Sequence, residues 1–296
     1  MTTTGANSVS NGTSINNSGN GVSNGKHHQK TFFLDIDNCL YPKSYRIHEM
    51  MGELIDEYFQ THLSLSKQDA FTLHQRYYKD YGLAIEGLVR FHKVDPLEYN
   101  EKVDDALALD EVIKPDPKLR RLLGDIDRSQ VKLWLFTNAY ITHGQRVVRL
   151  LGIEDCFDGI TYCDYGAEKL LCKPTREMYD KAMLDSGTTD VSQCYFIDDN
   201  ALNARAGTEY GWKCAHLVEP CVKAPEQPVS DFQIQSLEEL RQVFPELFKQ
   251  GPSTAATPRY ACYGYTLVAF EANTKLYCRM HGWIHRSEES RAVIRL

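Results

Sequence analysis

One stretch of this chain, from Thr31 to Tyr41, constrains its fold more than any other. Its sequence is Thr-Phe-Phe-Leu-Asp-Ile-Asp-Asn-Cys-Leu-Tyr. An apolar run that stops at two carboxylates is typical of a buried strand that ends in a loop. Residues i and i+2 of a strand point to the same side, so Asp35 and Asp37 can share one site. Carboxylates that close repel each other unless a proton or a cation lies between them, and their hard oxygen atoms favour Mg²⁺.

Three later stretches place further polar side chains at the boundaries of predicted strands or helices. They are Thr137 and Asn138 after the apolar run 131–136, Lys173 before Pro174, and Asp198 and Asp199 after the apolar run 195–197. The carboxyl ends of strands are where α/β sheets bind ligands. We therefore expect these side chains to belong to one site.

These stretches, in this order, resemble the four motifs of the haloacid dehalogenase superfamily of phosphatases, and the match extends from Thr31 to about Val218. Within that superfamily, the opening motif resembles the fungal pyrimidine 5′-nucleotidases. So do Tyr-Tyr-Lys-Asp-Tyr-Gly-Leu at 77–83, Gly87-Leu88 and Phe91-His92-Lys93-Val94. The resemblance implies an α/β fold, a doubly wound and mostly parallel sheet of the Rossmann-like type, with an inserted helical cap.

The order of predicted elements agrees with this expectation. Residues 30–45 and 116–249 form the predicted catalytic core, because strands and helices alternate there as in a parallel sheet with right-handed crossovers. Residues 46–115 are almost all helical in pattern, whereas a crossover needs only about a dozen residues, so we predict a helical cap there. We also predict a helix from Ser66 to Tyr81 that ends at Gly82, a helix that starts at Pro174, and a last helix over 237–248.

The two ends of the chain differ from this core in composition. Residues 1–29 are almost entirely Ser, Asn, Gly and Thr, which predicts a disordered tail. Residues 250–296 begin with a Gly-, Pro- and Thr-rich linker and continue as a basic, aromatic and weakly periodic segment. We expect this segment to be an atypical C-terminal extension that is poorly ordered.

Charge and hydropathy exclude some classes of function. The net charge of −7 argues against a protein that binds nucleic acid by neutralising phosphates. No apolar run approaches the roughly 20 residues of a membrane helix, and the N-terminus lacks a secretory signal. The nine cysteines have no framework-like spacing and predict reduced thiols. We therefore expect a cytoplasmic or nuclear protein without a membrane partner. The sequence carries no signal of oligomeric state.

The resemblance also implies a role for each candidate residue. Asp35 attacks the phosphorus of a phosphomonoester and forms an aspartyl-phosphate, and Asp37 acts first as the general acid and then as the general base. By the same resemblance, Asp35, Asp198 and the backbone carbonyl of Asp37 are expected to bind Mg²⁺. Thr137, Asn138 and Lys173 are expected to bind the phosphate. Asp199 is expected to support the metal or Lys173, and Asn203 to lie in an outer position. A carboxylate at position 37 argues against the dehalogenases, whose halide leaves without a proton.

The expected function is hydrolysis of pyrimidine nucleoside monophosphates such as UMP and CMP. The residues themselves indicate phosphomonoester hydrolysis, and only the resemblance indicates the nucleoside. An alternative substrate is another small phosphomonoester, such as nicotinamide mononucleotide, a sugar phosphate or a lysophosphatidate. The alternative from another class is a non-catalytic binding protein of the same fold. Mg²⁺-dependent turnover that Asp35→Asn abolishes distinguishes the two classes.

Overall fold

The computed structural model describes residues 30–250 and four short strands that follow them. The tail predicted over 1–29 lies outside the described residues, as does most of the extension predicted over 250–296. The four strands pair as two antiparallel hairpins, which are β7 (Ala261–Cys262) with β8 (Tyr265–Thr266) and β9 (Phe270–Ala272) with β10 (Lys275–Tyr277).

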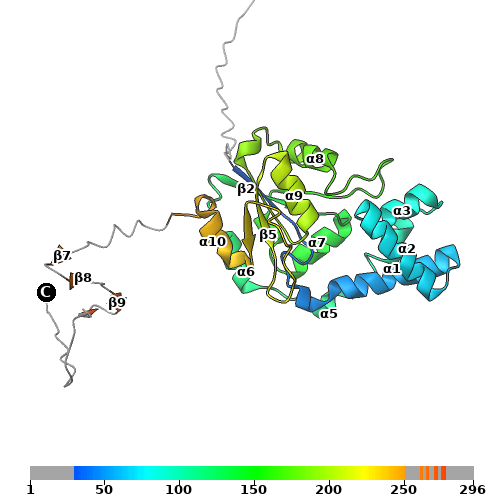
Figure 1. Ribbon diagram of the computed structural model, residues 1–296, viewed down its shortest axis with the longest axis horizontal. Coiled ribbons are helices and arrows are strands. Elements are labelled where there is room, and N and C mark those ends of the chain that lie inside the picture. Colours follow the sequence, from blue (N-terminus) through cyan, green and yellow to red (C-terminus); the bar gives the residue numbers. More distant parts are fainter. Residues whose placement is uncertain (1–29, 251–260, 263–264, 267–269, 273–274, 278–296) are drawn as a thin grey trace, which may run out of the picture.

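A six-stranded parallel sheet forms the centre of the part of the chain that the structure describes (Figure 1). Its order is β3-β2-β1-β4-β5-β6. The strands are β1 (Lys30–Leu34), β2 (Val131–Phe136), β3 (Gly159–Thr161), β4 (Cys194–Asp198), β5 (Lys213–Leu217) and β6 (Phe232–Ile234). This arrangement confirms the predicted α/β fold. Strand β6, a short strand at the edge of the sheet, was not predicted from the sequence.

The two faces of the sheet carry separate hydrophobic clusters. Phe32 packs with the aliphatic cluster on one face, and Phe33 packs on the other, because successive side chains of a strand alternate. Phe33 stacks on Trp212 with ring centroids 4.3 Å apart, and Phe136 meets the same indole edge-on at 5.8 Å. Burying each such ring contributes about 2 kcal/mol, so the motif strand β1 is anchored on both faces.

Helices cover both faces of the sheet. Residues of α6 (Pro117–Gly124), α7 (Ile141–Leu150) and α10 (Leu240–Val243) join the cluster around Phe32, whereas α8 (Arg176–Ser186) and α9 (Ala201–Tyr210) join the cluster around Phe33. The prediction of one helix over 237–248 was wrong. Pro245 cannot continue a helix, and the segment divides into α10 and the 3₁₀ turns η4 (Leu237–Glu239) and η5 (Pro245–Leu247). Helix α8 begins at Arg176 and not at Pro174.

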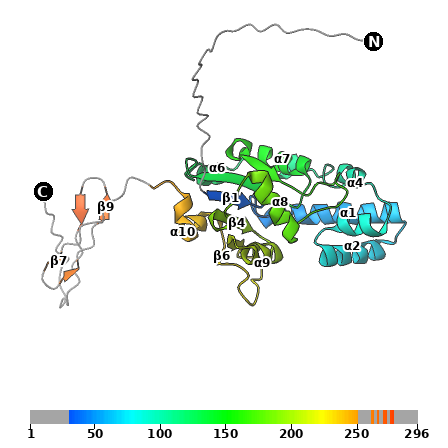
Figure 2. The same cartoon turned by 90° about the horizontal axis from the view of Figure 1, so that it is seen from above.

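Four helices lie together beside the sheet (Figures 1 and 2). They are α1 (Ile47–Leu63), α2 (Lys67–Tyr81), α3 (Ala84–Phe91) and α4 (Pro96–Lys102). Helix α2 has the predicted ends: the Ser66 hydroxyl accepts from the Asp69 amide at 3.2 Å, and Gly82 ends the helix with a φ of 82°. This group of helices lies in the region where the sequence predicts a cap, and the limits 46–115 stay a prediction.

The hydrophobic core of these four helices includes residues from the loop that follows β3. Cys163, Tyr165, Leu170 and Cys172 pack with side chains of α1 to α4 in one cluster. The helices are therefore packed against the loops of the sheet. The remaining short elements are α5 (Leu109–Val112), η1 (Lys43–Tyr45), η2 (Glu154–Cys156) and η3 (Val191–Gln193). None of the helices in the described part of the chain is both long and apolar enough to cross a lipid bilayer.

Candidate active site

Three of the predicted site residues meet at the carboxyl ends of neighbouring strands. Asp35 follows β1, Thr137 follows β2, and Asp198 ends β4. Because β1 lies between β2 and β4, the three side chains occupy one edge of the sheet. All three residues are buried, and the Asp35 amide donates to the Ile197 carbonyl at 3.0 Å, which holds the end of β1 against β4.

The ammonium group of Lys173 joins two of the carboxylates. Its Nζ lies 2.7 Å from Asp35 Oδ1, 2.7 Å from Asp198 Oδ2 and 2.7 Å from the Phe136 carbonyl oxygen. Burial alone would lower the pKa of Lys173, but the Asp198 and Asp35 carboxylates outweigh this effect and raise it. Each of the three ammonium protons has an acceptor. In this structure Lys173 therefore bridges the two carboxylates and offsets one of their two negative charges.

The backbone of Lys173 is held by the side chain of Asn138. Asn138 Nδ2 donates to the Lys173 carbonyl at 2.9 Å, and Asn138 Oδ1 accepts from the Lys173 amide at 2.7 Å. The predicted phosphate ligand Asn138 thus keeps its backbone N–H and the second hydrogen of Nδ2 for that role. Thr137 Oγ1 accepts from the Ala139 amide at 2.9 Å, which leaves the hydroxyl hydrogen of Thr137 for a ligand oxygen.

Asp198 and Asp199 have different partners. Asn203 Nδ2 lies 3.2 and 3.1 Å from the two carboxylate oxygens of Asp198, so this predicted outer residue orients the carboxylate. The side chain of Asp199 pairs instead with Lys43, at 2.8 Å between Nζ and Oδ2. Lys43 was not among the site residues predicted from the sequence. Its only signal was its place in the loop that follows the first motif.

Asp37 lies in an environment separate from that of Asp35. Its Oδ1 accepts from the Tyr41 hydroxyl at 2.7 Å and lies 2.8 Å from His143 Nε2. Burial would raise the pKa of Asp37, but the charge and hydrogen bond of His143 outweigh burial and lower it. The pKa of His143 is raised to about 9, because the Asp37 carboxylate outweighs the effect of burial. His143 was not among the site residues predicted from the sequence, and its signal was its place in the first turn of the helix after β2.

The arrangement suits a divalent cation. Single carboxylate oxygens of Asp35, Asp198 and Asp199 all lie within 4.8 Å of one another. Three carboxylates face two ammonium groups, those of Lys43 and Lys173, so one negative charge remains in excess. Burial and the Asp198 carboxylate raise the pKa of Asp35 well above its usual value, and the same two causes raise the pKa of Asp199 to about 6. Hard oxygen donors with excess negative charge fit Mg²⁺.

This set of oxygens differs from the predicted ligands in one respect. It includes the Asp199 carboxylate, to which the sequence analysis assigned a supporting role. The Asp37 carboxylate is absent from the set, and its Oδ1 is engaged by Tyr41 and His143. The prediction for Asp37 concerned its backbone carbonyl and stays a prediction.

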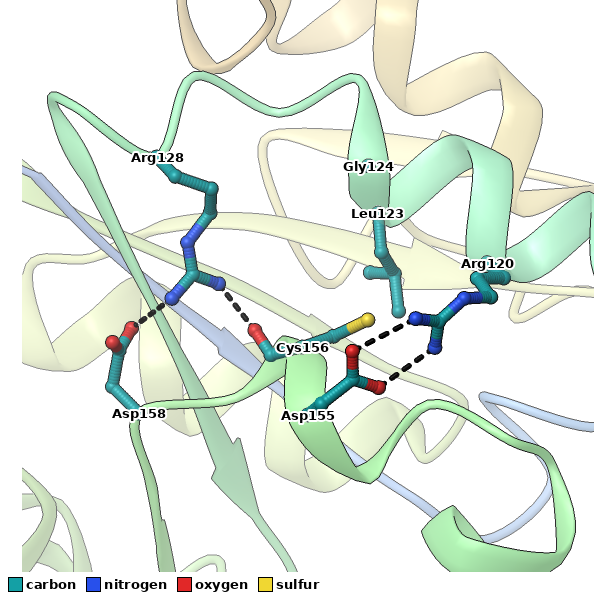
Figure 3. A pocket seen from close by; sticks show the side chains of 7 residues that line it. All are labelled: Arg120, Leu123, Gly124, Arg128, Asp155, Cys156 and Asp158. Atoms are coloured by element: carbon teal, nitrogen blue, oxygen red, sulfur yellow. Dashed lines mark hydrogen bonds and ion pairs between the residues drawn. The ribbon is translucent and has the colours of Figure 1, made fainter.

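A pocket of about 390 Å³ lies away from these residues (Figure 3). Arg128 precedes β2 and Asp158 precedes β3, so the pocket is near the amino ends of these strands, opposite the Asp35 edge. Its two arginines are already paired. Arg120 makes two hydrogen bonds to Asp155, at 2.7 and 2.8 Å, and Arg128 binds Asp158 at 2.6 Å. The pocket therefore offers no unpaired arginine to an anion.

The curated relatives that match this chain in sequence include a yeast protein and a bacterial protein. Phosphate metabolism protein 8 of Saccharomyces cerevisiae is 40% identical over 200 residues, which are 64% of this chain and 62% of that protein. The pyrimidine 5′-nucleotidase YjjG of Escherichia coli is 28% identical over 155 residues, which are 51% of this chain and 64% of that protein. The chain thus spans less than two thirds of the length of either relative.

The fold and the family are supported by two further comparisons. The crystal structure of CbbY from Rhodobacter sphaeroides in complex with phosphate superposes with a TM-score of 0.52 at 16% identity, over 71% of this chain and 96% of that one. At this identity the likeness shows the fold. The family model of the haloacid dehalogenase-like hydrolases matches residues 29–211, which is more than half of the chain. The family resemblance seen in the motifs is confirmed: the chain belongs to the haloacid dehalogenase-like hydrolases.

Proposed function

We propose that this chain is a phosphatase that hydrolyses phosphomonoesters through an aspartyl-phosphate on Asp35. One observation carries the proposal. Two carboxylates lie one residue apart in sequence, and each has its own cationic partner: Asp35 binds Lys173, and Asp37 binds His143. Paired carboxylates in different environments suit a division of labour between a nucleophile and a proton carrier.

In the first half of the proposed reaction, Asp35 attacks phosphorus. Lys173 engages Oδ1 of Asp35, and no hydrogen bond to Oδ2 is found within the described residues, so Oδ2 is the proposed nucleophile. The bond from Asp35 to phosphorus forms as the ester P–O bond breaks. Asp37 supplies a proton to the leaving oxygen; the approach of a dianionic phosphate raises the pKa of Asp37, which allows the carboxyl group to carry that proton.

In the second half, water cleaves the aspartyl-phosphate. Asp37, now a carboxylate, removes a proton from the water as the water oxygen bonds to phosphorus. The bond from phosphorus to Asp35 breaks, which releases inorganic phosphate and restores the Asp35 carboxylate. The Thr137 hydroxyl and the Asn138 backbone N–H are the proposed donors to the phosphoryl oxygens, in agreement with the groups that their other contacts leave available.

A magnesium ion is part of the proposal. Asp35, Asp198 and Asp199 would hold it, and Mg²⁺ bound there offsets the repulsion between the Asp35 carboxylate and a dianionic phosphate. The excess negative charge of these residues supports this assignment.

We further propose that the substrates are pyrimidine nucleoside 5′-monophosphates. The support is the likeness to a bacterial protein named as a pyrimidine 5′-nucleotidase and to motifs of the fungal nucleotidases. The proposed partner is therefore a small phosphorylated molecule. The support for the nucleoside part of the substrate is this similarity alone.

The test is phosphate release from a panel of phosphomonoesters. The panel contains UMP, CMP, AMP, GMP, nicotinamide mononucleotide, a lysophosphatidate and a sugar phosphate, each with Mg²⁺ or with EDTA. The wild type is compared with Asp35→Asn and with a control, Asp56→Asn, whose carboxylate pairs with His74 in the helices beside the sheet. We expect release from UMP and CMP that EDTA and Asp35→Asn abolish and that Asp56→Asn retains.

Other outcomes would contradict separate parts of the proposal. Release from a different substrate would contradict the nucleotidase assignment and keep the phosphatase. Full activity in EDTA would contradict the metal. A folded wild type that releases no phosphate from any member of the panel would contradict catalysis and favour a binding protein of the same fold.

A further inference from the structure

The two oxygens of Asp37 have different surroundings. Oδ1 accepts from the Tyr41 hydroxyl at 2.7 Å and contacts His143 Nε2 at 2.8 Å. For Oδ2, the described residues provide no hydrogen bond. The Asp37 side chain is 31% exposed, whereas that of His143 is fully buried, so His143 reaches a substrate only through Asp37.

The position of His143 depends on a close approach of α7 to the loop after β1 and to strand β3. His143 is in the first turn of α7, and the next residue is Gly144. A Cβ on Gly144 would lie 3.0 Å from Ile160 Cδ1 and 3.1 Å from Ile36 Cδ1. Because Gly144 has no side chain, the first turn of α7 can approach Ile36, the residue between the two catalytic aspartates. This approach brings His143 within hydrogen-bond distance of Asp37.

A second carboxylate lies near His143. Asp104, in the segment that follows α4, is buried, and its charge helps to raise the pKa of His143. Within the described part of the chain, neither His143 Nδ1 nor Asp104 Oδ2 has a hydrogen-bond partner. His143 thus lies in the field of two acidic groups, and Asp37 is the one to which it is hydrogen-bonded. The two negative charges favour the protonated His143 ring, whose Nε2–H points to Asp37.

We propose that His143, with Tyr41, is a positioning residue that holds Oδ1 of Asp37 and thereby leaves Oδ2 as the oxygen that transfers both protons of the reaction. The inference depends on the proposed phosphatase function. In the first half-reaction, the proton on Oδ2 passes to the leaving oxygen as the ester bond breaks. In the second, Oδ2 takes the proton of the water that displaces Asp35 from phosphorus. Holding the carboxylate in one orientation lowers the entropic cost of reaching the reactive geometry in both steps.

The leaving group separates this role from a purely structural one. An alkoxide such as the 5′-oxygen of UMP needs a proton from the general acid, whereas p-nitrophenolate is a weak base that leaves without one. Hydrolysis of the aspartyl-phosphate needs the general base for either substrate. A variant with a misplaced Asp37 should therefore form the aspartyl-phosphate from p-nitrophenyl phosphate quickly and hydrolyse it slowly.

The experiment compares UMP and p-nitrophenyl phosphate in the full chain with Mg²⁺. For His143→Leu we expect kcat on UMP to fall by about a hundredfold or more with little change in KM. With p-nitrophenyl phosphate we expect a rapid burst of one nitrophenolate per active site, followed by slow turnover. Tyr41→Phe should show the same pattern more weakly, and Asp37→Asn should show it fully. His143→Gln keeps an N–H donor and should recover part of the activity.

The matched control is His74→Leu. His74 is also buried and also pairs with an aspartate, at 2.7 Å between Nδ1 and Asp56 Oδ1, but it lies in α2. We expect no burst and unchanged kcat in this variant. The positioning role would be overturned if kcat fell equally on both substrates without a burst. It would also be overturned if neither His143→Leu nor Tyr41→Phe lowered kcat. A wild type inactive on both substrates and on every other member of the phosphomonoester panel would overturn the phosphatase proposal itself, and the inference with it.

Discussion

Lys173 stabilises two carboxylates that would otherwise repel each other. Its side chain is 1% exposed, and its Nζ lies 2.7 Å from a carboxylate oxygen of Asp35 and of Asp198. Removing one member of a buried ion group leaves the other charges uncompensated, so Lys173→Met should lower the free energy of unfolding by about 3–5 kcal/mol. Urea denaturation without metal measures the loss.

Lys43→Met is the control for this prediction. Lys43 also pairs with an aspartate of the site, but its side chain is 30% exposed. Water screens such a pair, so the expected loss is about 1 kcal/mol or less. Equal losses of stability in the two variants would show that burial does not account for the contribution of Lys173 to the free energy of unfolding.

The pair of His143 and Asp37 predicts a pH-dependent contribution to stability. The pKa of His143 is about 9 in the folded chain, because the charges of Asp37 and Asp104 outweigh burial and Arg146. In an unfolded chain it is about 6.5. A raised pKa of this kind contributes stability fully below about pH 6.5 and loses it as the pH rises through about 9.

The measurement compares the wild type with His143→Gln by urea denaturation, without metal. The advantage of the wild type should be about 3 kcal/mol at most near pH 7 and should disappear near pH 10. The series starts above pH 7 because burial raises the pKa of Asp104 to about 6, so this carboxyl titrates below that point. An advantage that stays constant up to pH 10 would contradict a charged His143.

At the scale of elements, α2 and α3 pack through a glycine. A Cβ on Gly87 would lie 2.2 Å from Tyr77 Cγ, so the ring of Tyr77 lies directly on the backbone of α3. Gly87→Ala should destabilise the chain by about 1–3 kcal/mol through overpacking. Hydrogen exchange should locate the loss in α2 and α3, with β1 and β4 protected as in the wild type.

Gly124→Ala provides the matched control. Gly124 is the last residue of α6, its φ is not positive, and a Cβ there would meet nothing within 4 Å. The substitution should leave stability unchanged or raise it by up to about 1 kcal/mol, because alanine loses less backbone entropy in a helix. Similar losses in both variants would contradict the role of the Tyr77 contact.

Some elements could be predicted from sequence and others could not. Helix α2 has both predicted ends, because Ser66, Asp69 and Gly82 act through local hydrogen bonds and backbone conformation. The helix predicted over 237–248 followed the apolar spacing through Pro245, where the chain turns instead. Strand β6 is three residues long and exists through its pairing with β5, which local sequence does not specify.

At the scale of the whole molecule, the site should link metal binding to stability. Mg²⁺ that binds the folded chain should stabilise it by about 2.7 kcal/mol at a hundred times its Kd, which raises Tm by roughly 5–10 °C for a chain of this size. Thermal unfolding with Mg²⁺ and with EDTA measures the shift. Asp198→Asn should abolish most of it, whereas Asp158→Asn, at the Figure 3 pocket, should retain it. A shift that Asp198→Asn leaves intact would place the metal elsewhere.

By itself, the sequence determined strands β1 to β5, their order along the chain and the polar residues at their ends, because strand patterns and motif spacing are local properties. Only the tertiary structure decided which side chains meet. Lys173 binds Asp35 across 138 residues of sequence, and His143 binds Asp37 across 106. These contacts exist because the parallel sheet places β1 between β2 and β4 and because Gly144 lets α7 approach Ile36. Such pairings depend on packing between distant segments, and no local pattern in the chain encodes them.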